Sequence, residues 1–186
     1  MTVRRAGEGR CKALNKTMKL RTSNPAKSPS SVHKNAASSD AEYGKNPLTD
    51  HQLALLRSTF ALVEPKAGIA GLVFYRNLFN LDPSLRRLFQ TSIELQARKL
   101  MESLGYTIAS FEQPESLISV LEPMGRRHAG YGVCEEHYDT VIRAMLQTLD
   151  DVLGGGFSAE AREAWKQALS FVARAMKAGA ARSVEK

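Results

Sequence analysis

The stretch Leu-Ile-Ser-Val-Leu-Glu-Pro-Met-Gly-Arg-Arg-His-Ala-Gly-Tyr-Gly-Val, residues 117–133, decides how the rest of the chain is interpreted. Four of its residues recur at helical spacing and share one face of a predicted α-helix, namely Leu117, Leu121, Met124 and His128. The imidazole of His128 therefore points where the apolar side chains point. Such a histidine is either a metal ligand or a core side chain satisfied by a hydrogen bond. This stretch alone leaves both interpretations open.

The 186 residues favour one domain with a sizeable core, preceded by an extension. Residues 1–45 carry ten Lys or Arg against three acids, a net charge of +7, which equals the charge of the whole chain. The extension is rich in Ser, Lys and Asn and poor in large apolar residues, so we expect it to be disordered. A solvated extension, a transit peptide, and loose contact with nucleic acid or anionic lipid all fit its composition.

The rest of the chain alternates helical patterns with breaks. A capping box at Thr49 and Gln52 predicts a first helix that ends at Glu64-Pro65. Further helices are expected over about 66–80, from Pro83 to residues 88–90, over 93–111, from Pro114 to Gly130, over 135–153, and from a cap at Ser158 to a stop at Gly179. No run alternates with a period of two. The sequence therefore predicts an all-α body of helices packed pairwise, without a sheet.

The two cysteines, Cys11 and Cys134, lie far apart, and a structural disulfide between them is not expected. The chain has no Cys-x-x-Cys-His motif and no Cys/His cluster with zinc spacing. It also has no secretory signal and no apolar run long enough to span a bilayer. We therefore expect a cytoplasmic protein with reduced thiols and no membrane span.

Four motifs in this helix order resemble a single-domain bacterial globin of the flavohaemoglobin-related and neuroglobin-like group. They are Val-Phe-Tyr-Arg-Asn-Leu-Phe at 73–79, Leu-Arg-Arg-Leu-Phe-Gln at 85–90, Gln-Ala-Arg-Lys-Leu-Met at 96–101 and Met-Gly-Arg-Arg-His-Ala-Gly-Tyr-Gly-Val at 124–133. The resemblance covers about residues 48–179. It implies a globin domain over 46–180, followed by a short tail over 181–186, with helices packed around non-covalent haem b.

The resemblance also assigns expected roles to individual residues. His128 resembles the proximal iron ligand, and Phe89 the phenylalanine that stacks on the haem plane. Gln96 and Tyr75 resemble the distal residues that face the gas ligand. The apolar lining would come from Leu100, Leu121, Met124, Val133 and Tyr138. Basic residues at 98, 99, 126 and 127 are candidates for the haem propionates, Arg127 and Lys99 first among them.

The implied chemistry is reversible binding of O₂, and of CO or NO, at the free axial position of a histidine-ligated haem. The Tyr75 hydroxyl and the Gln96 amide are hydrogen-bond donors suited to a gas ligand with partial negative charge. Such a bond contributes about 1.5–3 kcal/mol, so we expect tight binding and slow release. The alternative for Tyr75 is a core tyrosine bonded to a backbone carbonyl. His51 and His137 could compete as ligands, but surface roles are expected for both.

The sequence departs from the flavohaemoglobin pattern in two ways. It ends shortly after the last predicted helix, so NO dioxygenase turnover would need a separate reductase. Spacing places Ala180 where that family has an acid supporting the proximal histidine, which leaves Tyr138 without that partner. Oxygen binding, transport or NO scavenging is therefore the leading function. A weak haem enzyme acting on NO or nitrite, a gas sensor and a haem-free interaction protein are the alternatives, and no specific nucleic-acid partner is expected.

Overall fold

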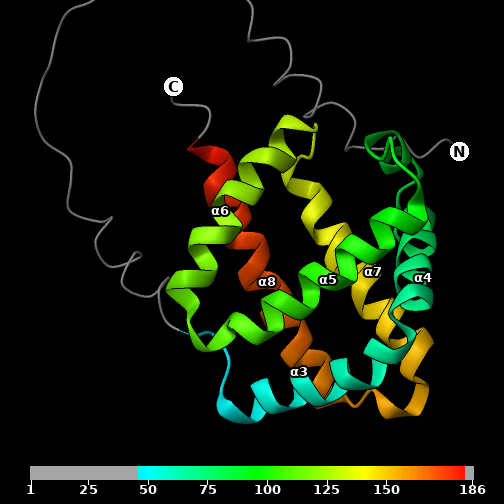
Figure 1. Cartoon of the computed structure of the whole chain (residues 1–186), viewed down its shortest axis with the longest axis vertical. Coiled ribbons are helices and arrows are strands. Elements are labelled where there is room, and N and C mark those ends of the chain that lie inside the picture. The colour runs from blue at the N-terminus through cyan, green and yellow to red at the C-terminus, as the bar shows by residue number, and fades with distance from the viewer. Residues whose placement is uncertain (1–45, 183–186) are drawn as a thin grey trace, which may run out of the picture. The chain divides into compact units, whose positions relative to one another are not determined.

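The computed structural model describes residues 46–182 of the chain. Six α-helices are joined by short 3₁₀ turns (Figure 1). The helices are α3 (Asp50–Val63), α4 (Ala67–Leu81), α5 (Ile93–Ala109), α6 (Pro114–Gly130), α7 (Glu135–Leu153) and α8 (Ala159–Ala181). The turns are η1 (Glu64–Lys66), η2 (Pro83–Leu88), η3 (Ser110–Glu112) and η4 (Gly154–Gly156). The described part contains no strand, which confirms the all-α prediction, while the expected extension over 1–45 lies outside it.

The first helix begins as the sequence predicts. The backbone N–H of Gln52 donates to Thr49 Oγ1 at 3.2 Å, and the backbone N–H of Thr49 donates to Gln52 Oε1 at 3.0 Å. Two of the orphan donors at the helix start are thereby satisfied reciprocally, which is the capping box read from the sequence. Ser158 caps α8 in a similar way, accepting a hydrogen bond from the backbone N–H of Ala161 at 3.1 Å.

The predicted end of the last helix is wrong, because α8 continues through Gly179 to Ala181. A Cβ atom at Gly179 would collide with the backbone oxygen of Glu122, and one at Gly125 would collide with that of Met176. These glycines let α6 and α8 approach to backbone contact, so Gly179 is a packing residue inside the helix and not its stop. Glu122 lies against Gly179 and Gly125 lies against Met176, so the two helices run antiparallel. The helix that carries His128 is thereby fixed against α8.

Buried polar side chains join helices that are distant in sequence. The indole N–H of Trp165 on α8 donates to Thr59 Oγ1 on α3 at 2.7 Å. On the other side of the domain, Asn77 of α4 donates through Nδ2 to the Thr148 hydroxyl at 3.3 Å and to the Asp151 carboxylate at 3.0 Å, both on α7. Because buried polar groups are costly without partners, these bonds specify which helix faces meet.

Helices α5 and α6 form a wedge that is closed at one end. They meet through η3 and separate toward the start of α5 and the end of α6 (Figure 1). The burial of their facing side chains decreases in the same direction. At the closed end Leu104, Phe111 and Leu117 are buried, whereas at the open end Gln96 and His128 are only half-buried. The rings of Phe111 and Phe171 pack at a tilt at the closed end, with centroids 5.8 Å apart.

The open end of the wedge is bordered by α4, η2 and α7. Apolar side chains of these elements, of the two wedge helices and of the segments next to them are partly buried and pack against the core, including Phe79, Leu88, Phe89, Ile93, Leu100, Met124, Val133, Val141 and Ile142. In the described chain α5 packs mainly on α4, and α6 mainly on α8, so neither is held chiefly by the other. Each of these elements therefore keeps some apolar surface that is only half-buried.

Candidate functional site: the open end of the α5–α6 wedge

His128 is held in a single tautomer by its own helix. Its Nδ1 lies 2.8 Å from the backbone oxygen of Met124, one turn earlier in α6. Since a carbonyl oxygen can only accept, Nδ1 carries the proton and Nε2 keeps its lone pair. Burial lowers the pKa of His128, the bond to Met124 opposes that shift, and the nearby Arg127 adds to it. The result is a neutral imidazole with a free nitrogen donor, the form that a metal requires.

Tyr75 lies in the interior of the domain, and its side chain is only 5% exposed. Among residues 46–182 no group accepts from or donates to its hydroxyl. The backbone-carbonyl alternative is therefore not seen in the described chain. Burial raises the pKa of Tyr75 to about 12, so the hydroxyl stays protonated and able to donate. A buried donor without a partner is costly, which makes it a candidate for contact with a ligand.

An aromatic cluster surrounds Tyr75. The ring of Phe89 lies edge-on to it with centroids 5.1 Å apart, and those of Phe74 and Phe79 lie at 5.2 and 5.8 Å. Phe79 and Phe89 also contact each other, at 5.6 Å. Two residues expected at the site, Tyr75 and Phe89, are thus in direct contact. The cluster fixes the Tyr75 ring by packing alone, since edge-to-face pairs prefer such distances.

Gln96 is half-buried in the first turn of α5, and its amide Nε2 donates to the hydroxyl of Thr91 at 2.5 Å. Thr91 belongs to the short segment between η2 and α5. Thr91 is not among the residues predicted from the sequence, although its hydroxyl, five residues before Gln96 and next to the Ser92 helix cap, is a signal that could have indicated it. This bond orients the Gln96 side chain and leaves the second amide hydrogen free.

The expected lining residues reach the open end unequally. Leu100 and Met124 are half-buried, while Leu121 and Tyr138 are buried. Val133 is half-buried and is attached to the histidine helix, because its backbone N–H donates to the oxygen of His128 at 3.0 Å. Leu121 therefore belongs to the transition between the closed and open ends, and Leu100 and Met124 to the opening itself.

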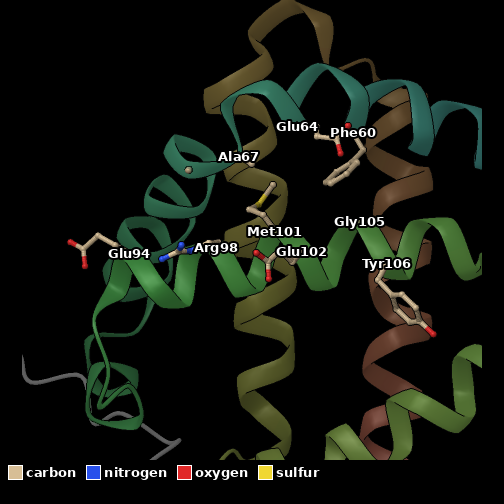
Figure 2. A pocket seen from close by; sticks show the side chains of 10 residues that line it. Phe60, Glu64, Ala67, Glu94, Arg98, Met101, Glu102, Gly105 and Tyr106 are labelled. Atoms are coloured by element: carbon tan, nitrogen blue, oxygen red, sulfur yellow. The ribbon is translucent and has the colours of Figure 1, made fainter.

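The basic candidates separate into two groups. Arg127 is exposed beside His128, and its charge contributes to the lowered pKa of that histidine. Lys99 is exposed on α5. Arg98, by contrast, lines a surface hollow formed with α3 and the start of α4 (Figure 2). Because residues two apart lie about 200° around a helix, Arg98 points away from the face that carries Gln96. Arg98 therefore faces away from Gln96, and which basic residue serves the haem propionates stays a prediction.

The competing histidines are engaged elsewhere. His51 is exposed and lies 3.7 Å from the Glu160 carboxylate. His137 accepts a hydrogen bond through Nδ1 from the backbone N–H of Cys134 at 3.0 Å, and burial lowers its pKa. In the part of the chain that is described, no three His, Cys, Asp or Glu side chains converge as a metal cluster. A metal bound at the wedge would therefore need further ligands that do not come from the protein. A prosthetic group supplies such ligands to the metal it carries.

The structure differs from the sequence-based expectations around Tyr138 and at Cys134. Gly179 lies beside Glu122, six residues before His128, so the neighbouring Ala180 is not level with the histidine. The α8 side chain that contacts Tyr138 is Lys177, whose Nζ lies 5.6 Å from the ring centroid and 3.5 Å from Glu135 Oε1. Cys134 is disulfide-bonded, which contradicts the expectation of two unlinked thiols, and Cys11 lies outside the described residues.

Two features suit a prosthetic group that carries a metal. His128 keeps a donor lone pair on Nε2, and the Tyr75 hydroxyl, whose ring contacts Phe89, has no partner in the described chain. A comparison with known families agrees, because the family model for globins matches residues 72–176, more than half of the chain. The chain belongs to the globin family.

Curated relatives of this globin include haem proteins of two kinds. It is 29% identical over 130 residues to a flavohemoprotein of Xylella fastidiosa, a match that covers 68% of this chain and 32% of the relative. It is 26% identical over 144 residues to anaerobic nitrite reductase HBII of Casuarina glauca, which covers 69% of this chain and 90% of the relative. This globin therefore spans about a third of the flavohemoprotein it matches.

A solved structure supports the same fold. The crystal structure of a hexacoordinated heme protein from an anhydrobiotic tardigrade superposes with a TM-score of 0.67 at 18% identity, covering 73% of this globin and 96% of that chain. At this identity the likeness shows the fold alone. None of the helices described for this globin is long and apolar enough to cross a membrane.

Proposed function

We propose that this globin holds haem b at the open end of the α5–α6 wedge and reversibly binds O₂ with high affinity, together with CO and NO, for oxygen binding or transport or for NO scavenging. The observation that carries the proposal is the tautomer of His128. Its Nδ1–H is taken by the Met124 oxygen at 2.8 Å, which leaves Nε2 as the donor atom for iron. Haem b, when bound, would supply the iron that takes up a diatomic gas.

The residues around the opening have separate tasks. Phe89, Leu100, Met124 and Val133 provide half-buried apolar surface for a porphyrin. Tyr75 provides a protonated, preoriented hydroxyl, and Gln96 provides an amide whose position is set by Thr91. Both can donate to a polar gas ligand. Arg127 and Lys99, both exposed, are the candidates for the carboxylates of the haem edge.

The first experiment is the visible absorption spectrum of the purified protein in its ferric, dithionite-reduced and CO-bound forms. We expect a strong Soret band that shifts with CO. The same band should weaken or shift in His128→Ala and be restored by added imidazole, while His137→Ala, the matched control, should leave it unchanged. A colourless protein that takes up no added haemin would overturn the proposal.

Oxygen release tests the two donors. Removing a buried charge-assisted hydrogen bond costs about 1.5–3 kcal/mol, so O₂ dissociation should accelerate about ten- to a hundredfold in Tyr75→Phe and in Gln96→Leu. Thr91→Val should accelerate it less, because the Gln96 amide is then unanchored but still present. Rates in Tyr75→Phe and Gln96→Leu that equal the wild-type rate would exclude the donor role.

A second candidate is a haem enzyme that oxidises NO or reduces nitrite with electrons from a separate reductase. It is favoured by the two curated relatives, a flavohemoprotein and an anaerobic nitrite reductase. Sustained consumption of NO or nitrite over many turnovers, only when a reductase and NADH are supplied, would support it. A single stoichiometric turnover under the same conditions would leave gas binding as the function.

A further inference from the structure

A hollow of about 680 Å³ lies on the face of α5 that points away from the wedge (Figure 2). Its floor is apolar and its rim is charged. Phe60 of α3, Ala67 and Gly68 of α4, and Met101 and Gly105 of α5 form the floor. The side chain of Met101 rises from α5 into the space between Ala67 and Phe60 (Figure 2). A Cβ atom at Gly68 would meet nothing within 4 Å, so the space above this glycine is open.

Three carboxylates and one guanidinium line the hollow. Glu94, Arg98 and Glu102 follow one another along α5, and Glu64 faces them from η1. All four side chains are exposed, and within residues 46–182 none of them forms an ion pair. The rim therefore carries a net charge of −2, which disfavours an anionic occupant such as a fatty acid or a phosphate ester.

The spacing of the carboxylates restricts the occupant further. Glu94 and Glu102 are eight residues apart on one helix, which corresponds to about 12 Å along its axis. No group of three acidic, His or Cys side chains in the described chain is arranged to hold a metal ion. A compact cation is therefore not the occupant that fits. The occupant that fits this rim carries positive charges spaced along an apolar chain. That chain can lie over Met101 and Ala67.

From this charge complementarity we infer that the hollow is a binding site for a linear aliphatic polyamine. Its methylene segments would cover the apolar floor beside Gly68, and its ammonium groups would reach Glu64 and Glu102, with Glu94 at the far end. This site is independent of the haem proposal, because it lies on the opposite face of α5 and uses none of the residues assigned to haem or gas.

Isothermal titration of the purified full chain with spermidine tests the inference at low ionic strength. We expect one saturable site that weakens about tenfold between about 0.02 M and 0.3 M salt, because the charges are exposed. Mg²⁺ should bind more weakly, since it has no apolar chain. In ¹H–¹⁵N spectra the amide signals of Gly68 and Gly105 should shift with spermidine, while that of Gly155 should not.

Substitutions separate this site from general attraction to acidic side chains. Glu64→Gln and Glu102→Gln should each weaken spermidine binding about two- to fivefold, as expected for exposed ion pairs, whereas the exposed Glu115→Gln, the matched charge control, should not change it. Arg98→Gln should tighten binding, because it removes the one repulsive charge. The Arg98 result distinguishes a specific site from a merely structural effect, since a folding defect would weaken binding.

The open space above Gly68 allows a steric test. Gly68→Leu should fill the hollow and abolish binding, and Gly155→Leu, at another glycine whose Cβ would meet nothing, should leave binding intact. Absence of saturable binding, or equal affinity in wild type, Glu64→Gln and Gly68→Leu, would overturn the inference. Haem uptake and gas binding are unaffected by either result, so the two proposals fail separately.

Discussion

The two ends of the α5–α6 wedge are built from similar residues but are buried to different extents. At the closed end Phe111 and Leu117 are each 1% exposed. At the open end Phe89, Leu100 and Met124 are only half-buried, Tyr75 contacts Phe89, and His128 is hydrogen-bonded to the Met124 oxygen. The closed end supplies stability, because its apolar surface is buried within the protein. The open end keeps comparable surface available for a ligand.

The largest expected effect comes from matched phenylalanines at the two ends. Phe111→Ala should lower the free energy of unfolding of the haem-free protein by about 3–5 kcal/mol, because it empties a fully buried position. Phe89→Ala should lower it by only about 1–2 kcal/mol, since its ring is half-buried before any ligand binds. Urea unfolding followed by circular dichroism measures both. Equal losses would contradict the difference between the ends.

The next effect concerns the attachment of the histidine helix. Gly125→Ala should destabilise the protein by about 1–3 kcal/mol, because its Cβ would collide with the Met176 backbone and push α6 from α8. Gly130→Ala, in the last turn of the same helix, has open space around it and should be neutral or stabilising by up to about 1 kcal/mol. Thermal unfolding of the two variants compares them, and similar melting temperatures would show that α6 is not fixed by this contact.

A smaller effect of opposite sign is expected at Tyr75. Tyr75→Phe should stabilise the haem-free protein by about 1 kcal/mol, because it removes a buried hydroxyl that has no partner in the described chain. Tyr106→Phe is the matched control, since Tyr106 is 56% exposed and its loss of a hydroxyl should change nothing. If Tyr75→Phe destabilises the haem-free protein in urea titrations, the hydroxyl has a hydrogen-bond partner within the protein. It is then not available to a ligand.

The smallest effect is spectroscopic. Burial raises the pKa of Tyr75 from 10.0 to about 12, so the folded state holds this proton more tightly than the unfolded state does. The contribution to stability is therefore complete below pH 10 and is lost as the pH rises toward 12. Ultraviolet difference spectra of the wild type should contain a tyrosinate step near pH 12 that is absent from Tyr75→Phe. A step lost from Tyr75→Phe near pH 10 would contradict the raised pKa of Tyr75.

Several features of the fold could be predicted from the sequence because their signals are local. The capping box at Thr49, the short helix after Pro83 and the helical spacing of Leu117, Leu121, Met124 and His128 depend on neighbours a few residues away. The structure places these elements as expected and brings Tyr75 into contact with Phe89. The roles proposed for these residues toward haem and gas remain predictions.

Other features could not be found because they depend on which helices cross and in which register. A glycine at the end of a helical pattern, such as Gly179, predicts the end of the helix. The close approach of α6 instead makes Gly179 a packing residue inside α8. Sequence spacing put Ala180 near His128, whereas the antiparallel register puts Lys177 on Tyr138. Arg98 and Lys99 are adjacent in sequence, yet the rotation of α5 directs Arg98 into the hollow on the other face.

The sequence by itself determined the helices, their caps and the single apolar face that carries His128, because hydrogen bonds and side-chain periodicity within a helix are local. The tertiary structure decided the closed and open ends of the wedge, the partner of Gln96, the unpartnered state of the Tyr75 hydroxyl and the acidic hollow behind α5. Those features arise from the angles and distances at which helices cross. These are set by the packing of side chains from segments that lie far apart along the chain.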